Sequence, residues 1–153
     1  MNATGPDNGV NNSKHPGEPP APAPRNAGPG RLLVAVYAIF ALAATARAAF
    51  QILTKFDHAP LAYLLSAFAA VVYIVATVGL ARSGSTAYKV SVAAVGVEMP
   101  GVLAVGIFGL LDPAALPEDT VWSGFGSGYG YVPLVLPAIG LWWLYRHRAD
   151  ARR

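Results

Sequence analysis

The chain has 153 residues, of which 54% are hydrophobic and 12% charged, the composition of a membrane protein rather than of a water-soluble globular one. It contains no cysteine, which excludes thiolate catalysis, disulfide exchange and cysteine-based metal sites. The formal net charge of +3 comes mainly from four arginines near the C-terminus. Such a cluster beside a span sets topology and contacts anionic lipid, so we expect no nucleic-acid partner.

Residues 1–30 differ from the rest of the chain, because they hold seven of the thirteen prolines together with Gly, Asn and Ser. A segment with so little apolar surface cannot offset the entropy of ordering, so we expect a disordered cytoplasmic tail with polyproline II character. A docking ligand for a proline-reading domain is the functional alternative for this tail.

Four apolar runs follow the tail, at residues 32–53, 60–81, 88–111 and 131–145. A hydrocarbon core about 30 Å thick needs roughly 20 helical residues to cross it, and inside lipid each run must satisfy its own backbone as a helix. Short connections at about 54–59 and 82–86 place the first three runs antiparallel to one another. The sequence therefore predicts an all-α membrane fold over residues 31–146, a four-transmembrane-helix antiparallel bundle with a disordered N-terminal tail.

The first run has features of a cleaved signal peptide, since Arg31 precedes it and Ala46-Arg47-Ala48 has the small-x-small form of a cleavage site. The region before it, however, is 30 residues long and rich in proline, and the apolar run resumes after Ala48. We favour a retained helix.

Lys and Arg are distributed unequally between the two sides that these spans define. Nine of the eleven share one side: Lys14, Arg25, Arg31, Arg82, Lys89, Arg146, Arg148, Arg152 and Arg153. The other side holds Lys55 with four acids, Asp57, Asp112, Glu118 and Asp119. The positive-inside rule places both termini, including the basic tail 147–153, in the cytoplasm of a multi-pass protein, and we expect a bacterial cytoplasmic membrane.

Glu98 lies near the middle of the third span, where a charged side chain facing lipid costs on the order of 2.5–3.5 kcal/mol. It must therefore face the bundle, be protonated or be paired. Pro100 and Gly101 follow, and we expect them to kink the helix and free carbonyl groups beside the acid. Arg47 of the first span, with Gln51 one turn later on the same face, is the expected partner at an axial offset of about 10 Å.

Two interpretations of this pair stay open. It is either a structural buried pair that fixes helix register, or a gated proton or substrate site whose acid is released when the pair breaks. No Ser-His-Asp set, carboxylate pair or metal-ligand spacing accompanies it in the sequence, so we expect neither an enzyme nor a cofactor or metal.

The third loop, residues 112–130, is acidic at first and then rich in glycine and aromatics, and a loop of that length usually has a function or some structure of its own. Its glycines lack the strand and lysine of phosphate-binding loops, and Gly128-Tyr129-Gly130 shares only three residues with a potassium-channel filter. We expect an extracytoplasmic lid that buries four aromatic residues in the headgroups: Trp122, Phe125, Tyr129 and Tyr131. An extracytoplasmic ligand or partner site is the alternative.

The chain resembles uncharacterised small integral membrane proteins of actinobacteria over about residues 31–146. The resemblance lies in Ala43-Ala44-Thr45-Ala46-Arg47, Gln51, Lys55-Phe56, Ala59-Pro60-Leu61-Ala62-Tyr63-Leu64-Leu65-Ser66, and Val121-Trp122-Ser123 followed by Gly128-Tyr129-Gly130-Tyr131-Val132-Pro133-Leu134. It implies the four-helix fold and the membrane compartment, and no activity.

We expect a non-catalytic accessory or scaffold subunit in contact with the lipid bilayer, as a homo-oligomer or with a membrane protein partner. A small proton-coupled transporter or channel using Glu98 is the alternative.

Overall fold

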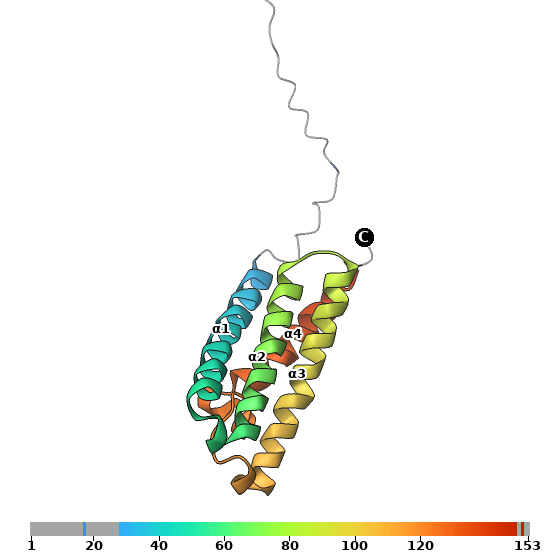
Figure 1. Cartoon of the computed structure of the whole chain (residues 1–153). Coiled ribbons are helices and arrows are strands. Elements are labelled where there is room, and N and C mark those ends of the chain that lie inside the picture. Colours follow the sequence, from blue (N-terminus) through green and yellow to red (C-terminus); the bar gives the residue numbers. More distant parts are fainter. Residues whose placement is uncertain (1–16, 18–27, 150, 152–153) are drawn as a thin grey trace, which may run out of the picture.

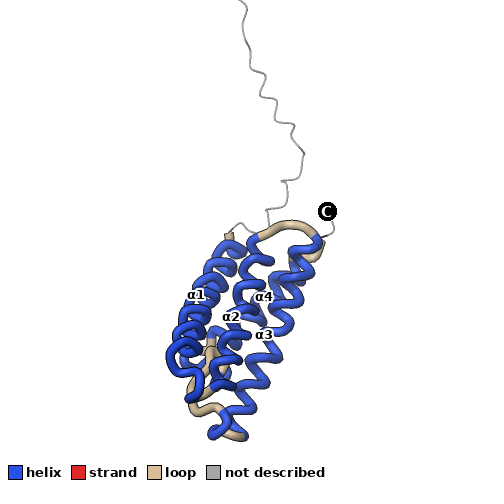
Figure 2. Tube along the Cα trace, viewed as in Figure 1, coloured by secondary structure: helices blue, strands red, loops and turns tan. Residues whose placement is uncertain are grey.

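The computed structural model describes residues 17, 28–149 and 151 (Figures 1 and 2). The predicted disordered tail lies almost wholly outside the described residues, as does most of residues 150–153. All regular secondary structure within residues 28–149 is helical.

Four α-helices form the body of the molecule: α1 Pro29–Lys55, α2 Pro60–Ala81, α3 Ser85–Leu111 and α4 Val132–Arg146. Three short 3₁₀ segments connect them: η1 Phe56–His58, η2 Pro113–Ala115 and η3 Ser123–Tyr129. Each α-helix begins and ends within three residues of the run that predicts it. Prolines at the first turns of α1 and α2 lack an amide hydrogen that the helix would leave unpaired in any case, so they suit the start of a helix.

Three of these helices, α1, α2 and α3, are long and apolar enough to cross a membrane, which makes this a membrane protein. The fourth, α4, is apolar but has only 15 residues. At 1.5 Å per residue it extends about 22 Å, less than the hydrocarbon thickness of about 30 Å. By length and composition, therefore, three helices are candidate spans, and the fourth span remains a prediction.

Successive helices pack side by side in an antiparallel order, with α4 against α3 (Figure 1). The start of α1, the turn between α2 and α3, and the end of α4 lie together at one end of the bundle. The core is built largely from alanines and tyrosines, with Ala44 and Ala76 and three tyrosines, Tyr37, Tyr63 and Tyr73, almost fully buried. Small residues allow close approach of helix backbones, the usual packing mode in membranes.

Large apolar side chains cover the outside of the bundle, as expected for a surface in contact with lipid. Leu42 on α1 is 74% exposed, and Leu53 and Leu111 are about 80% exposed. An apolar surface of this extent would be unusual on a water-soluble monomer.

The chain between α3 and α4 does not stay at the end of the bundle. This returning segment, residues 112–131 and orange in Figure 1, folds back beside the lower halves of α1 and α2. Trp122 lies against Gly101 of α3, where an added Cβ would be only 2.7 Å from the indole. Gly101 is ten residues before the end of α3, so the segment reaches about 15 Å from that end toward the middle of the bundle.

The depth of the returning segment accounts for the shortness of α4. Gly140 of α4 packs against Tyr37 of α1 and Val95 of α3, each 3.1 Å from the position of a Cβ on that glycine. Counting residues from this contact places the start of α4 about 12 Å from the level of the end of α3, nearer the middle of the bundle. The end of α4 lies within about 6 Å of the level at which α3 starts. The helix therefore needs only 15 residues to reach the end of the bundle where α1 begins.

Candidate functional site

Glu98 lies at the midpoint of α3, thirteen residues and about 20 Å from either end, and its side chain is completely buried. Tyr37 of α1 donates a hydrogen bond to Oε2 of Glu98 at 2.7 Å. The acid therefore faces the bundle interior, and its described partner is a phenol rather than a cation.

Tyr73 of α2 and Trp122 of the returning segment complete a buried polar group around Glu98. The indole Nε1 of Trp122 donates to Oη of Tyr73 at 3.0 Å, and the rings of Tyr37 and Tyr73 lie 6.2 Å apart. We call these four residues, Tyr37, Tyr73, Glu98 and Trp122, the Glu98 cluster. Each comes from a different element, so the cluster joins α1, α2, α3 and the returning segment.

One polar atom of the cluster is unpaired. Among the described residues, Oε1 of Glu98 has no hydrogen-bond partner, and neither do Oε1 of Gln51 or the hydroxyls of Tyr63 and Ser66. Buried polar atoms are usually paired, so each of these positions has hydrogen-bonding capacity that the protein itself does not use.

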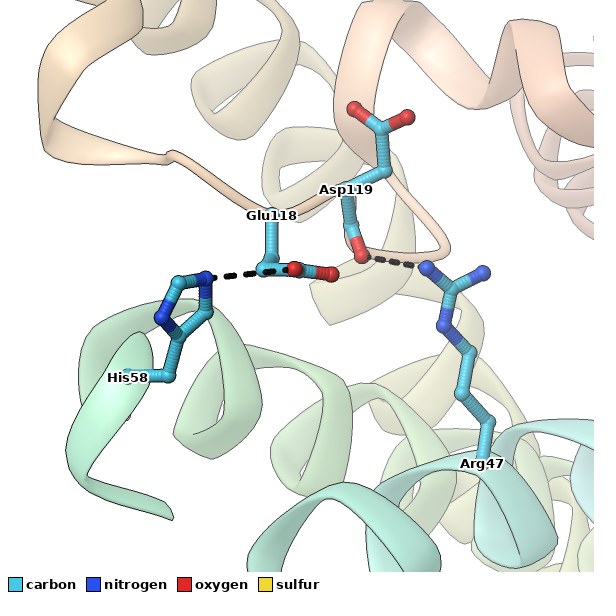
Figure 3. Close-up of polar contacts among 4 residues, drawn as sticks. All are labelled: Arg47, His58, Glu118 and Asp119. Atoms are coloured by element: carbon cyan, nitrogen blue, oxygen red, sulfur yellow. Dashed lines mark hydrogen bonds and ion pairs between the residues drawn. The ribbon is translucent and has the colours of Figure 1, made fainter. Parts of the chain in front are cut away.

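The predicted pair between Arg47 and Glu98 is not formed. Arg47 donates from Nη2 to the backbone oxygen of Asp119 at 2.6 Å, as Figure 3 shows, and from Nη1 to Oη of Tyr129 at 3.0 Å. Two physical reasons account for the difference. The expected axial offset from Glu98 was about 10 Å, and the returning segment supplies closer acceptors at the level of Arg47. Gln51 is buried near the Lys55 end of α1, and its Oε1 has no hydrogen-bond partner among the described residues.

The returning segment has structure of its own, but it is not a lid in the headgroups. Trp122 is only 1% exposed, so its predicted interfacial position is wrong. Phe125 packs against Gly106 of α3, and Tyr129 packs on Phe40 of α1 with ring centroids 5.7 Å apart. Tyr131, at 53% exposed, is the one of the four predicted aromatics that remains at the surface.

The backbone of this segment turns sharply to bring these rings inward. Phe125 and Tyr131 both have a φ of 59°, in the left-handed region that side chains other than glycine rarely adopt. Their neighbours Gly124, Gly126 and Gly130 also have positive φ, which glycine tolerates without steric cost. The alternating glycines therefore serve the tight left-handed turns that let the chain re-enter the bundle.

α3 continues as helix through Pro100, from Ser85 to Leu111, and the kink at Pro100 and Gly101 stays a prediction. Gly101 also lies against the Trp122 ring, where a larger residue would leave no room for the indole.

A polar cavity of about 380 Å³ lies beside Arg47 and the returning segment. Its lining residues are Arg47, Asp119, Thr120, Ser123, Gly124, Ser127, Gly128 and Tyr129. At the end of this segment, Nε2 of His58 and Oε1 of Glu118 lie 3.4 Å apart and link it to η1 (Figure 3). Within the described part of the chain, no three His, Asp or Glu side chains are grouped so as to hold a metal ion.

Sequence reasoning identified Glu98 but missed Tyr37 and Tyr73. Their depth along the bundle axis could have identified them. From the predicted span limits, both hydroxyl-bearing residues lie within about 6 Å of the depth of Glu98, closer than Arg47.

No protein family, curated protein or solved structure matches this chain. The fold and the Glu98 cluster define its class, an α-helical membrane protein with a buried acid held by aromatic side chains and a returning segment that packs inside the bundle.

Proposed function

We propose that this chain is a non-catalytic accessory or scaffold subunit of a bacterial cytoplasmic membrane complex, with four membrane-spanning helices and both termini in the cytoplasm. The observation that carries the proposal is the Glu98 cluster. Its acid is 0% exposed and is joined to side chains of other elements, an arrangement that specifies packing.

Charge supports the proposed orientation. The end of the bundle where α1 begins carries Arg31, Arg82 and Arg146, whereas the opposite end carries Lys55 among acidic residues. The positive-inside rule assigns the first end to the cytoplasm. The depth of the returning segment supports a fourth span, because α4 then completes a crossing that this segment has begun.

The absence of cysteine from the sequence makes the topology directly testable. Single-cysteine variants Ser83→Cys, Ala114→Cys and Arg148→Cys would be treated in intact cells with a membrane-impermeant maleimide. We expect labelling at Ala114→Cys alone, with the other two reacting only after the membrane is opened. Labelling of Arg148→Cys in intact cells would mean that α4 does not cross.

The subunit role is tested by purifying tagged full-length protein from its own membranes in mild detergent or nanodiscs and weighing the intact assembly. We expect a second protein at fixed stoichiometry, and an assembly of this chain alone would contradict the accessory role. Membranes carrying the tag on an unrelated four-span protein provide the control for nonspecific capture.

A small proton-coupled transporter or channel is the second candidate, favoured by one specific observation. Oε1 of Glu98 is buried at mid-span without a protein partner, and an intramembrane acid with free capacity is a feature of proton-carrying sites. Glu98→Gln in reconstituted vesicles should then abolish pH-driven flux while leaving insertion intact. Flux that persists in this variant would refute the transport role.

A further inference from the structure

The polar cavity beside Arg47, described above, lies well inside the bundle, away from the Lys55 end of α1. Arg47 is eight residues before Lys55, which places its backbone about 12 Å from that end of the helix. Non-helical backbone at such a depth is tolerated only where protein covers it or where it lines a water-filled space. A cavity of about 380 Å³ is large enough for several waters or a small solute.

No carboxylate of the described residues forms an ion pair with Arg47 in this cavity. Its two hydrogen bonds go to neutral acceptors, the backbone oxygen of Asp119 and the phenol of Tyr129. The carboxylate of Asp119 points away from the guanidinium, and Glu118 is occupied by His58 (Figure 3). A guanidinium held by neutral groups retains its affinity for an anion.

Hydrogen-bond donors remain available around this charge. A guanidinium has five N–H donors, and the two described bonds use only two of them. Tyr129 accepts from Arg47, so its own hydroxyl hydrogen is free to donate. The hydroxyl of Ser127 also lines the cavity, whereas those of Thr120 and Ser123 bond each other.

We propose that this cavity binds a small oxyanion of the phosphate type, with Arg47 as its charged ligand and Tyr129 and Ser127 as donors. Arginine is suited to this role because its planar fork matches two oxygens of a phosphate at once. The phosphate can belong to a free solute or to a lipid headgroup of the outer leaflet. The site does not depend on the accessory role, because a subunit and a transporter can both hold it.

Gly128 allows a sharp test that leaves the Arg47 contacts in place. It lines the cavity, and a Cβ added there meets nothing within 4 Å. Gly128→Asp would add a carboxylate to the lining of the cavity, and Gly128→Asn is a control of the same shape without the charge. Arg47→Gln tests the guanidinium directly, with Arg31→Gln at the other end of α1 as its control.

The experiment is calorimetric titration of the purified full chain in dodecyl maltoside, which contains no phosphate, at constant ionic strength. The two probes are inorganic phosphate and soluble dihexanoyl phosphatidylglycerol. We expect the dissociation constant of at least one probe to rise tenfold or more in Gly128→Asp and Arg47→Gln. It should stay within about twofold in the two controls.

Each outcome decides the proposal. Charge-sensitive binding of inorganic phosphate supports a free solute as the source, and charge-sensitive binding of the lipid probe alone supports a headgroup. Absence of binding for both probes would overturn the proposal, as would equal binding by Gly128→Asp and Gly128→Asn. The Gly128 pair keeps the test decisive if Arg47→Gln fails to fold.

Discussion

Removal of one hydroxyl from each of two buried tyrosines tests how much the Glu98 cluster stabilises the bundle. Tyr37 and Tyr63 are both completely buried and both lie in spanning helices. Tyr37 donates to Glu98, whereas the hydroxyl of Tyr63 has no hydrogen-bond partner among the described residues. Tyr37→Phe and Tyr63→Phe delete the same atom, but only Tyr37→Phe removes a described hydrogen bond.

The expected magnitudes follow from this difference. Tyr37→Phe removes a buried bond to a carboxyl group whose other oxygen, Oε1, already lacks a partner among the described residues. Buried hydrogen bonds of this kind contribute about 1–2 kcal/mol, with measured values in membranes toward the low end. Tyr63→Phe removes a polar atom that pairs with nothing, so its free energy of unfolding should fall by no more than about 0.5 kcal/mol and can rise.

Reversible unfolding of the purified chain in mixed micelles of dodecyl maltoside and dodecyl sulfate measures both variants, with circular dichroism as the readout. A double-mutant cycle with Glu98→Leu, which cannot accept the hydrogen bond, isolates the Tyr37–Glu98 interaction from other effects of the substitution. If Tyr63→Phe destabilises the protein as much as Tyr37→Phe, the hydrogen bond to Glu98 does not carry the effect and the reasoning fails.

Three other substitutions test the returning segment. Trp122→Phe loses the hydrogen bond to Tyr73 and part of the ring volume, and should lower the free energy of unfolding by about 1–3 kcal/mol in the same micelles; a loss below about 0.5 kcal/mol would contradict its buried placement. Gly101→Ala puts a methyl group 2.7 Å from that indole, so protease added on the outer side should cleave residues 112–131 faster, and cleavage at the wild-type rate would show that the contact is dispensable. His58→Ala breaks an exposed ion pair with Glu118 and should change the free energy of unfolding by less than about 0.5 kcal/mol, a limit that a larger measured loss would disprove.

Most of the fold follows from the sequence because the length of an apolar run determines whether it can form a helix that crosses a membrane. The predicted run 60–81 coincides with α2, and the other runs differ from their helices by one to three residues. The four-span count remains a prediction, since α4 falls short on length alone. Local pattern could not show that the chain from residue 112 folds inward, because that depends on a surface that exists only when α1, α2 and α3 are packed.

The candidate site was predictable in part. The cost of a charge in lipid singles out Glu98 and places it in the interior. The choice of Arg47 as its partner was wrong, because the prediction gave more weight to opposite charge than to a similar depth along the bundle axis. Tyr37 and Tyr73 lie closer to Glu98 in depth along the bundle axis. Gly101 was predicted only as part of a kink in α3, whereas in the structure it also contacts Trp122.

The order of the cluster along the chain has a consequence for biogenesis. Tyr37, Tyr73 and Glu98 are synthesised before Trp122, which lies about one helical turn from the acid, toward the Leu111 end of α3. The helices α1, α2 and α3 can therefore be complete before the returning segment is made. A chain truncated before residue 112 would keep Glu98 and Tyr73 but lack the indole that donates to Tyr73.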